Sequence, residues 1–128
     1  MDGVTSADTI RMTIPALLAY VRLPRVAIAG LATRSGFSYD EVEDLRLAVG
    51  EVCQVLLDGA DRDGTLTIDF AVERGSVRVQ VAIDAPPGQH DGLAERLAEQ
   101  ILAATVGDVE VDRDGRRITF AMTAVDED

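Results

Sequence analysis

Two consecutive stretches in which apolar and polar residues alternate constrain this sequence most. The apolar positions are Leu66, Ile68, Phe70 and Val72 in the first stretch, and Val77, Val79, Val81 and Ile83 in the second. Successive side chains of a strand point to opposite faces, so a period of two indicates strands with one apolar face. Arg74-Gly75 between them predicts a hairpin turn. Such a hairpin needs a cover on its apolar face and leaves the other face to water.

Helical patterns precede the hairpin. Residues 17–35 are apolar and alanine-rich, which predicts a helix that is kinked at Pro24 or begins near it, because a proline inside a helix costs about 3 kcal/mol. Gly36 is placed to end this helix. Residues 38–41, Ser-Tyr-Asp-Glu, have the pattern of a capping box. Apolar residues then recur every three or four positions, which predicts a second helix that ends at about Leu57 or Asp58.

The rest of the chain supplies further short elements. Residues 9–14 alternate as a strand, residues 93–104 have the spacing of a third helix, and residues 109–111 and 118–122 predict two more strands. We therefore expect a two-layer α/β (α+β) sandwich, with a mixed but mostly antiparallel five-stranded sheet and three helices on one face. Residues 1–128 are expected to form a single domain, with residues 1–7 and 125–128 loose.

The composition excludes several classes of chemistry. All 12 basic residues are arginine, which rules out a catalytic or phosphate-binding lysine. One histidine, His90, and one cysteine, Cys53, cannot form a His/Cys zinc site, and no metal site is predicted. The net charge of −11 disfavours direct binding to DNA or RNA and favours a basic protein surface as partner.

The sequence contains neither a long apolar run nor a signal-peptide pattern. The lone cysteine suits a reducing compartment. We therefore expect a cytoplasmic protein that does not enter a membrane.

Two segments resemble a known family. RVAIAGLA (residues 25–32) and GFSYDEVEDLRLAVGEVC (residues 36–53) are similar to the anti-sigma-factor serine kinases of bacterial partner-switching systems, which control stress and sporulation sigma factors. These kinases belong to the GHKL, or Bergerat-fold, ATPases. The resemblance is close over residues 14–53 and continues as a strand pattern to residue 124. It implies the same order of elements as the residue patterns do.

The resemblance implies three devices for ATP, and this sequence departs from each of them. The family's Glu-x-x-x-Asn becomes Glu51 followed by Val55, and an alkyl side chain cannot bind Mg²⁺. In the family's Asp-x-Gly-x-Gly turn, Asp84 matches the adenine-binding Asp and Gly88 the second Gly, but Pro86 replaces the first. Only residues 89–92 stand where the phosphate lid should be.

A fourth departure is Arg116, which stands where the family tends to carry Thr beside adenine. No departure touches the apolar core pattern. The resemblance therefore makes Glu51 a remnant of the catalytic base, but without a metal-binding Asn we favour the reading of an ordinary solvated or salt-bridged Glu. Asp84 and Gly88 are in the same way remnants of the nucleotide site, or simply turn residues.

Other residues have open readings too. The resemblance implies that Arg25, with Arg22 as a weaker companion, contacts a sigma factor, while both are also compatible with a solvated helix face. Cys53 is expected to be a buried, unreactive thiol and His90 a solvated loop residue. Arg116 and Arg117 could face a phosphate or an acidic partner, but such a pair more often lies at a solvated strand edge, which is what we expect.

Our leading hypothesis is therefore an anti-sigma-factor-like regulator that sequesters a sigma factor and competes with an anti-anti-sigma factor, without a required cofactor. We expect it to form a homodimer. The alternative is an enzyme, an ATP- and Mg²⁺-dependent serine kinase that phosphorylates the anti-anti-sigma factor. A third possibility is a scaffold that pairs with a related, active kinase.

Overall fold

A computed structural model describes residues 7–58, 64–85, 106, 108–112 and 116–125. Its elements are β1 (Asp8–Pro15), the 3-10 helix η1 (Leu18–Tyr20), α1 (Arg22–Arg34), α2 (Tyr39–Asp58), β2 (Thr65–Glu73), β3 (Ser76–Asp84), β4 (Asp108–Asp112) and β5 (Arg117–Thr123). This agrees with the order predicted from the residue patterns. The third helix expected over residues 93–104, together with Pro86, Gly88 and His90, lies outside the described residues.

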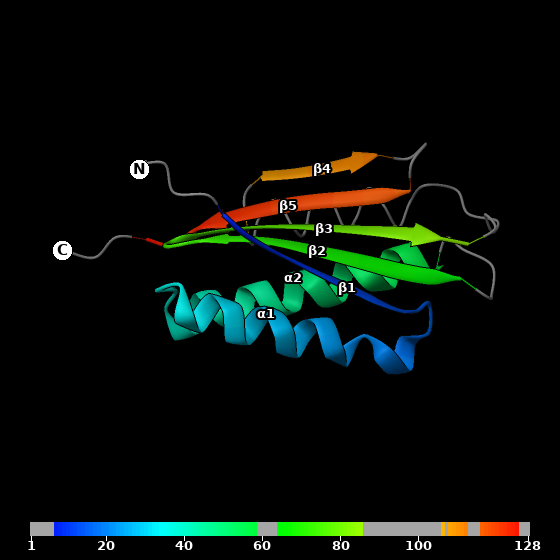
Figure 1. Ribbon diagram of the computed structural model, residues 1–128, viewed down its shortest axis with the longest axis horizontal. Coiled ribbons are helices and arrows are strands. Elements are labelled where there is room, and N and C mark those ends of the chain that lie inside the picture. Colours follow the sequence, from blue (N-terminus) through cyan, green and yellow to red (C-terminus); the bar gives the residue numbers. More distant parts are fainter. Residues whose placement is uncertain (1–6, 59–63, 86–105, 107, 113–115, 126–128) are drawn as a thin grey trace.

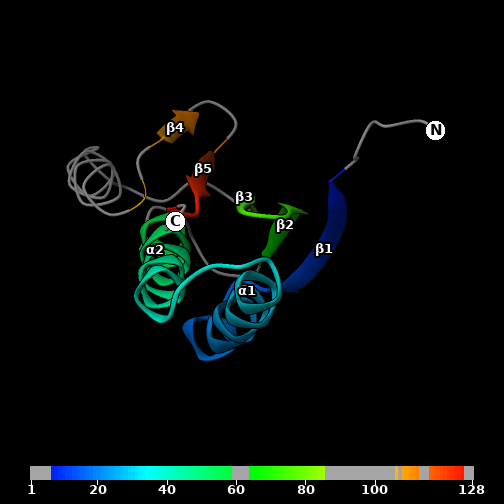
Figure 2. The ribbon, with the colours of Figure 1, turned by 90° about the vertical axis from the view of Figure 1, so that its left-hand side faces the viewer.

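The five strands form one sheet in the order β1-β2-β3-β5-β4. All four neighbouring pairs are antiparallel, so the expectation of a mixed sheet was wrong. The reason lies in the last two strands. β3 and β4 run in the same direction, but β5 returns between them and pairs antiparallel with both. Figures 1 and 2 show α1 and α2 packed side by side on one face of this sheet, as expected for a two-layer sandwich.

Helix α1 begins after the 3-10 turn, as one of the two predicted alternatives requires. Pro24 is its third residue, where the helix has no internal acceptor for a backbone N–H and proline is tolerated. At the other end, Gly36 has a φ of +93°, and the N–H of Phe37 donates to the carbonyl of Ala32 at 3.2 Å. This is the glycine-terminated helix end that the sequence predicted.

Helix α2 begins with the predicted capping box. The N–H of Ser38 donates to Oε1 of Glu41 at 2.7 Å, and the N–H of Glu41 donates to Oγ of Ser38 at 3.2 Å. The second carboxylate oxygen of Glu41 accepts the N–H of Val125 at 2.8 Å. Residue 125 is therefore held in place, contrary to the expectation that the chain is loose from there. The hydrogen bonds from Ser38 and Val125 lower the pKa of Glu41 below its ordinary value of 4.5.

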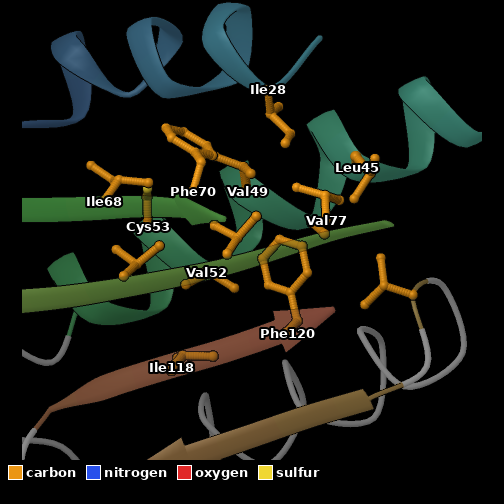
Figure 3. Close-up of a cluster of buried hydrophobic side chains, with 14 of the residues drawn as sticks. Ile28, Leu45, Val49, Val52, Cys53, Ile68, Phe70, Val77, Ile118 and Phe120 are labelled. Carbon is orange, nitrogen blue, oxygen red and sulfur yellow. The ribbon is translucent and has the colours of Figure 1, made fainter. Parts of the chain in front are cut away.

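The core lies between the helices and the sheet (Figure 3). Register aligns its largest side chains across the strands, with Phe70 opposite Val79 and Val79 opposite Phe120. The α2 residues on this side are buried, including Cys53. Burial raises the pKa of the Cys53 thiol to about 12, which agrees with the unreactive thiol that the sequence predicted. None of the described helices is both long and apolar enough to cross a membrane.

Candidate functional site

A shallow groove of about 410 Å³ runs between the η1–α1 segment and α2. Its lining residues are Leu18, Ala19, Val21, Arg22, Arg25, Arg46, Leu47, Gly50, Glu51 and Gln54. The groove thus brings together three residues singled out from the sequence, Arg22, Arg25 and Glu51. Asp84 is not among its lining residues. We refer to this feature as the helix groove.

The Arg25 side chain lies close to Gly50 of α2 in the helix groove. A Cβ on Gly50 would lie 3.4 Å from Cδ and 3.7 Å from Nε of Arg25, which is ordinary van der Waals contact. The Nε atom of Arg25 is buried and has no hydrogen-bond partner in the described part of the molecule. A buried donor without an acceptor is costly, because it has lost water and gained nothing in return. An acceptor supplied by a bound partner would remove that cost.

Exposed apolar side chains share these elements with the two arginines: Leu18 and Leu47 line the helix groove, and Leu23 and Val26 each follow one of the arginines in α1. Leu18 is 62% exposed, Leu23 43%, Val26 66% and Leu47 52%. Such residues are ordinary when scattered, but here they gather on η1, α1 and the facing side of α2. An apolar surface edged by charged groups is typical of a protein-binding site.

Arg46 differs from Arg25 in having a partner. It donates to both carboxylate oxygens of Glu43, at 2.9 and 3.2 Å, one helical turn away. Its charge is therefore partly neutralised within α2. Arg22 and Arg25 make no ion pair with the described residues, so they supply the positive charge of the helix groove.

The position expected to hold Mg²⁺ lies in the core. Val55 is only 8% exposed and belongs to the buried face of α2, whereas Glu51 is half-buried in the helix groove. Within the described residues no three His, Cys, Asp or Glu side chains are arranged to hold a metal ion. The donor set at Glu51 and Val55 therefore does not fit the magnesium site implied by the family resemblance.

Asp84 is the last residue of β3 and does not line the helix groove. It pairs with Thr65 and shares its strand face with Gln80 and Ala82, the face turned away from the helices. It is exposed. Asp84 and Glu51 therefore do not line the helix groove together, and Gly88 lies outside the described residues.

The backbone that follows β3 is enclosed by two residues that the sequence analysis did not assign to this role. Arg116, which has a φ of +54°, donates from Nη1 to the carbonyl of Ala85 at 2.6 Å. On the other side, a Cβ on Gly64 would collide with the carbonyl oxygen of Asp84 and with the side chain of Ala85. Arg117 is exposed to solvent, as expected, and pairs with Asp112 at 3.0 Å, whereas Arg116 is half-buried. The expectation of a sheet edge was wrong, because β5 lies between β3 and β4 and pairs with both.

Arg116 and Gly64 gave only weak signals in the sequence. A glycine before a strand and an arginine after a turn are common, and neither predicts a contact across the sheet. Only the pairing of β3 with β5 brings Arg116 beside residue 85.

Comparisons with known proteins agree with this geometry at the level of the fold. Residues 14–127 match the family of histidine kinase-like ATPase domains. A crystal structure of the RsbU and RsbW domains of a Mycobacterium tuberculosis protein superimposes with a TM-score of 0.68 at 17% identity, over 91% of this chain and 32% of that one. This second likeness concerns the fold alone.

Relatives of known name are serine-protein kinases. RsbW of Bacillus subtilis is 32% identical over 125 residues, which are 95% of this chain and 77% of that kinase. RsbW of Halalkalibacterium halodurans is 33% identical over 95 residues, and RsbW of Bacillus velezensis is 40% identical over 81 residues. These last two matches cover 73% and 61% of this chain but only 59% and 51% of those kinases. The family predicted from the sequence is thereby confirmed: this chain belongs to the histidine kinase-like ATPase domains and, within them, to the anti-sigma-factor serine kinase family that includes RsbW.

Proposed function

We propose that this protein is an anti-sigma regulator that acts by binding protein partners, and that its nucleotide site is weakened or lost. The observation that carries the proposal is the helix groove, in which Arg25 has a buried donor without an acceptor beside exposed leucines. A partner that brings an acidic and an apolar side chain would satisfy both features.

The proposed mechanism is occlusion. A sigma factor bound across η1, α1 and the helix groove would have part of its surface covered and would be kept from RNA polymerase. An anti-anti-sigma factor would compete for an overlapping surface. The proposal places the protein in the cytoplasm, where sigma factors act, and includes a homodimer as the working form and the stress response as the context.

Binding to candidate sigma factors tests the proposal directly. Arg25→Ala should weaken binding about ten-fold or more, because it removes a central interface cation. Arg34→Ala is the matched control, since Arg34 is exposed at the other end of the same helix and lies outside the helix groove. The proposal fails if no sigma or anti-anti-sigma factor binds at micromolar concentration, or if the two variants weaken binding equally.

The second candidate function is an ATP-dependent serine kinase that phosphorylates an anti-anti-sigma factor. The comparisons favour this candidate more directly than the first, because the named relatives are serine-protein kinases. Glu51 would then be the base that takes the proton from the serine hydroxyl. Against it stands the buried Val55 at the metal position.

Calorimetry with ATP, with and without Mg²⁺, separates the two candidates. The binding-only function predicts no binding at nucleotide concentrations up to about the millimolar range. Transfer of phosphate from ATP to an anti-anti-sigma factor, lost in Glu51→Gln, would establish the kinase instead. Sedimentation of the protein alone measures whether it is a dimer.

A further inference from the structure

The two edge strands of the sheet differ in how well they are protected against pairing with another strand. They are β1 and β4, and Figure 2 shows them at opposite margins of the sheet. β4 has five residues, of which three are acidic, Asp108, Glu110 and Asp112, and such charges protect an edge. β1 has eight residues, four of them β-branched, and its Ile10 is 36% exposed. β1 is therefore the edge at which another strand would pair more readily.

The pairing of β1 with β2 shows which backbone groups of β1 point outward. Pro15 lies opposite Thr65, and the N–H of Ala16 donates to the carbonyl of Gly64 at 2.9 Å. Hydrogen-bonded and non-hydrogen-bonded pairs alternate along an antiparallel ladder. The even-numbered residues of β1 therefore bond to β2, and the odd-numbered ones direct their backbone groups away from the sheet. Pro15 is odd-numbered, so at this edge it offers only a carbonyl.

The side chains of β1 complement those of a second β1 that runs antiparallel to it. A two-fold axis at Met12 places Met12 opposite its own copy and Ile10 opposite Ile14 of the other chain. Apolar side chains then meet on the face that carries the helices. On the open face, Arg11 lies opposite Thr13 of the other chain, and no two like charges are paired.

The other positions of the axis are less favourable. An axis at Arg11 would place two arginines opposite each other, which is destabilising. An axis at Ile10 would place Asp8 opposite Met12 on the helix side, where a carboxylate loses water. An axis at Thr13 avoids both problems but pairs a shorter part of the strand. The axis at Met12 thus gives the longest register without an unfavourable pair.

A cleft beside β1 fits the same arrangement. It has a volume of about 740 Å³, and its lining includes Ile10 of β1, Leu31 of α1 and Val72 of β2. Antiparallel pairing brings the end of one β1 beside the start of the other, where this cleft opens. Leu17, which follows the end of β1, is 53% exposed and does not line the helix groove. In the paired molecule, Leu17 of each chain would reach an apolar surface of the other.

We propose that β1 is the interface of a homodimer, in which the β1 strands of two copies pair antiparallel about a two-fold axis at Met12 and join their sheets. This inference rests on the homodimer included in the proposed function and names the surface that forms it. β4 is unsuited to the same role. An axis at Glu110 would place Glu110 opposite its copy and Asp108 opposite Asp112, so carboxylates would repel at every pair on the open face.

Cysteine cross-linking under mild oxidation tests the register. In Met12→Cys the two Cα atoms would lie about 4.5 Å apart, which a disulfide spans. In Ile10→Cys they would lie about 14 Å apart, which is too far. We expect a covalent dimer from Met12→Cys and none from Ile10→Cys, Thr13→Cys or Glu110→Cys. The native Cys53 does not interfere, because it is buried and its pKa is raised to about 12.

Sedimentation equilibrium of charge variants tests the same contact without a covalent bond. Thr13 is exposed, so its replacement should not disturb the fold. Thr13→Lys would face Arg11 of the other chain and should raise the dimer dissociation constant about five-fold, whereas Thr13→Glu should lower it. Thr67→Lys is the matched control, because Thr67 lies beside Thr13 on β2 and away from the edge. It should change the dissociation constant less than about two-fold, and high salt should abolish the difference between the Thr13 variants.

Cross-linking at Ile10, Thr13 or Glu110 in place of Met12 would overturn the inference. Equal dissociation constants for Thr13→Lys and Thr13→Glu would overturn it as well. In both cases the protein would still be a dimer, so the proposed function would stand and only the interface would be wrong. A wild type that sediments as a monomer would overturn the homodimer itself, while the binding of sigma factors is tested separately with Arg25→Ala.

Discussion

Two regions of the molecule differ in whether their buried polar groups have hydrogen-bond partners. One is the helix groove. The other is the end of β3, where Arg116 and Gly64 enclose residues 84 and 85, and we call it the β3 exit. In the helix groove, Arg25 keeps a buried donor that has no acceptor among the described residues, and the exposed Leu18 and Leu47 line the same groove. At the β3 exit, the carbonyl of Ala85 is taken by Arg116, and the backbone fits against Gly64 without space for a methyl group. Among the described residues, the first region keeps a buried polar group without a partner, and in the second the Ala85 carbonyl has one.

This difference has a consequence for function. Unsatisfied buried groups and exposed apolar surface cost stability, so they persist where a partner supplies the missing contacts. A site whose groups are already satisfied internally offers a ligand little to gain. The contrast supports a protein partner at the helix groove more than a nucleotide at the end of β3.

The largest effect is expected at Gly64. Gly64→Ala should lower the free energy of unfolding by up to about 3 kcal/mol, because the methyl group would collide with backbone atoms that cannot easily move. Denaturant unfolding measures this loss. Gly30→Ala is the control. Nothing lies within 4 Å of a Cβ at Gly30, which is an exposed position inside α1, so alanine there should stabilise by about 0.5–1 kcal/mol. If both substitutions changed the free energy of unfolding in the same direction, the backbone around Gly64 would have room for a methyl group, contrary to this prediction.

Much of the fold could be predicted because its signals are local. The capping box at Ser38 and Glu41, the glycine end at Gly36 and the alternation of β2 and β3 each depend on neighbouring residues, and each was confirmed. The contacts that the sequence analysis missed are long-range. The hydrogen bond from Arg116 spans 31 positions, and that from Val125 to Glu41 spans 84. No periodicity encodes such pairs.

The second prediction concerns the core side of α2. Val55→Asn should destabilise the protein by about 2 kcal/mol, because the side-chain amide would be buried in the core without hydrogen-bond partners. Gln54→Asn, at the adjacent exposed position, should change stability by less than about 0.5 kcal/mol. If Val55→Asn were neutral and also acquired Mg²⁺-dependent ATP binding, the buried position would be part of a nucleotide site after all.

The candidate site was predicted less completely than the fold. The resemblance selected Arg22, Arg25 and Glu51, and the structure places all three along one groove. It gave no indication that Arg25 of α1 lies close to Gly50 of α2. That contact depends on the angle at which α1 and α2 pack, which follows from the whole core rather than from either helix. The pair of Glu43 and Arg46 is different, because residues three apart on one helix are neighbours whatever the packing.

The third prediction compares two carboxylates of α2. Both oxygens of Glu41 accept backbone N–H groups, whereas Glu51 has no partner among the described residues. Glu41→Gln should cost about 1 kcal/mol, since its amide group would face a backbone donor. Glu51→Gln should cost less than about 0.5 kcal/mol.

The pH dependence follows from the same hydrogen bonds. The pKa of Glu41 is lower in the folded protein than its ordinary value of 4.5, so its stabilisation is fully present above that value. It is lost as the pH falls below about 4.5 and through the folded pKa. Unfolding curves between pH 7 and pH 3 should therefore show a smaller loss for Glu41→Gln than for the wild type. If the wild type and Glu41→Gln lost stability equally between pH 7 and pH 3, the Glu41 carboxylate would not be stabilised by the hydrogen bonds from Ser38 and Val125.

The smallest effect is expected at the pair that distinguishes Arg46 from Arg25. Glu43→Gln should lower stability by only about 0.3 kcal/mol, because an exposed ion pair one turn apart on a helix is weak. The difference from the wild type should disappear in high salt, where exposed charges are screened. A difference that survived high salt would mean that Glu43 acts through packing rather than charge.

The variant also releases Arg46 into the helix groove. An acidic partner should then associate faster with the variant at low salt, which makes this small change in stability a test of the groove's charge.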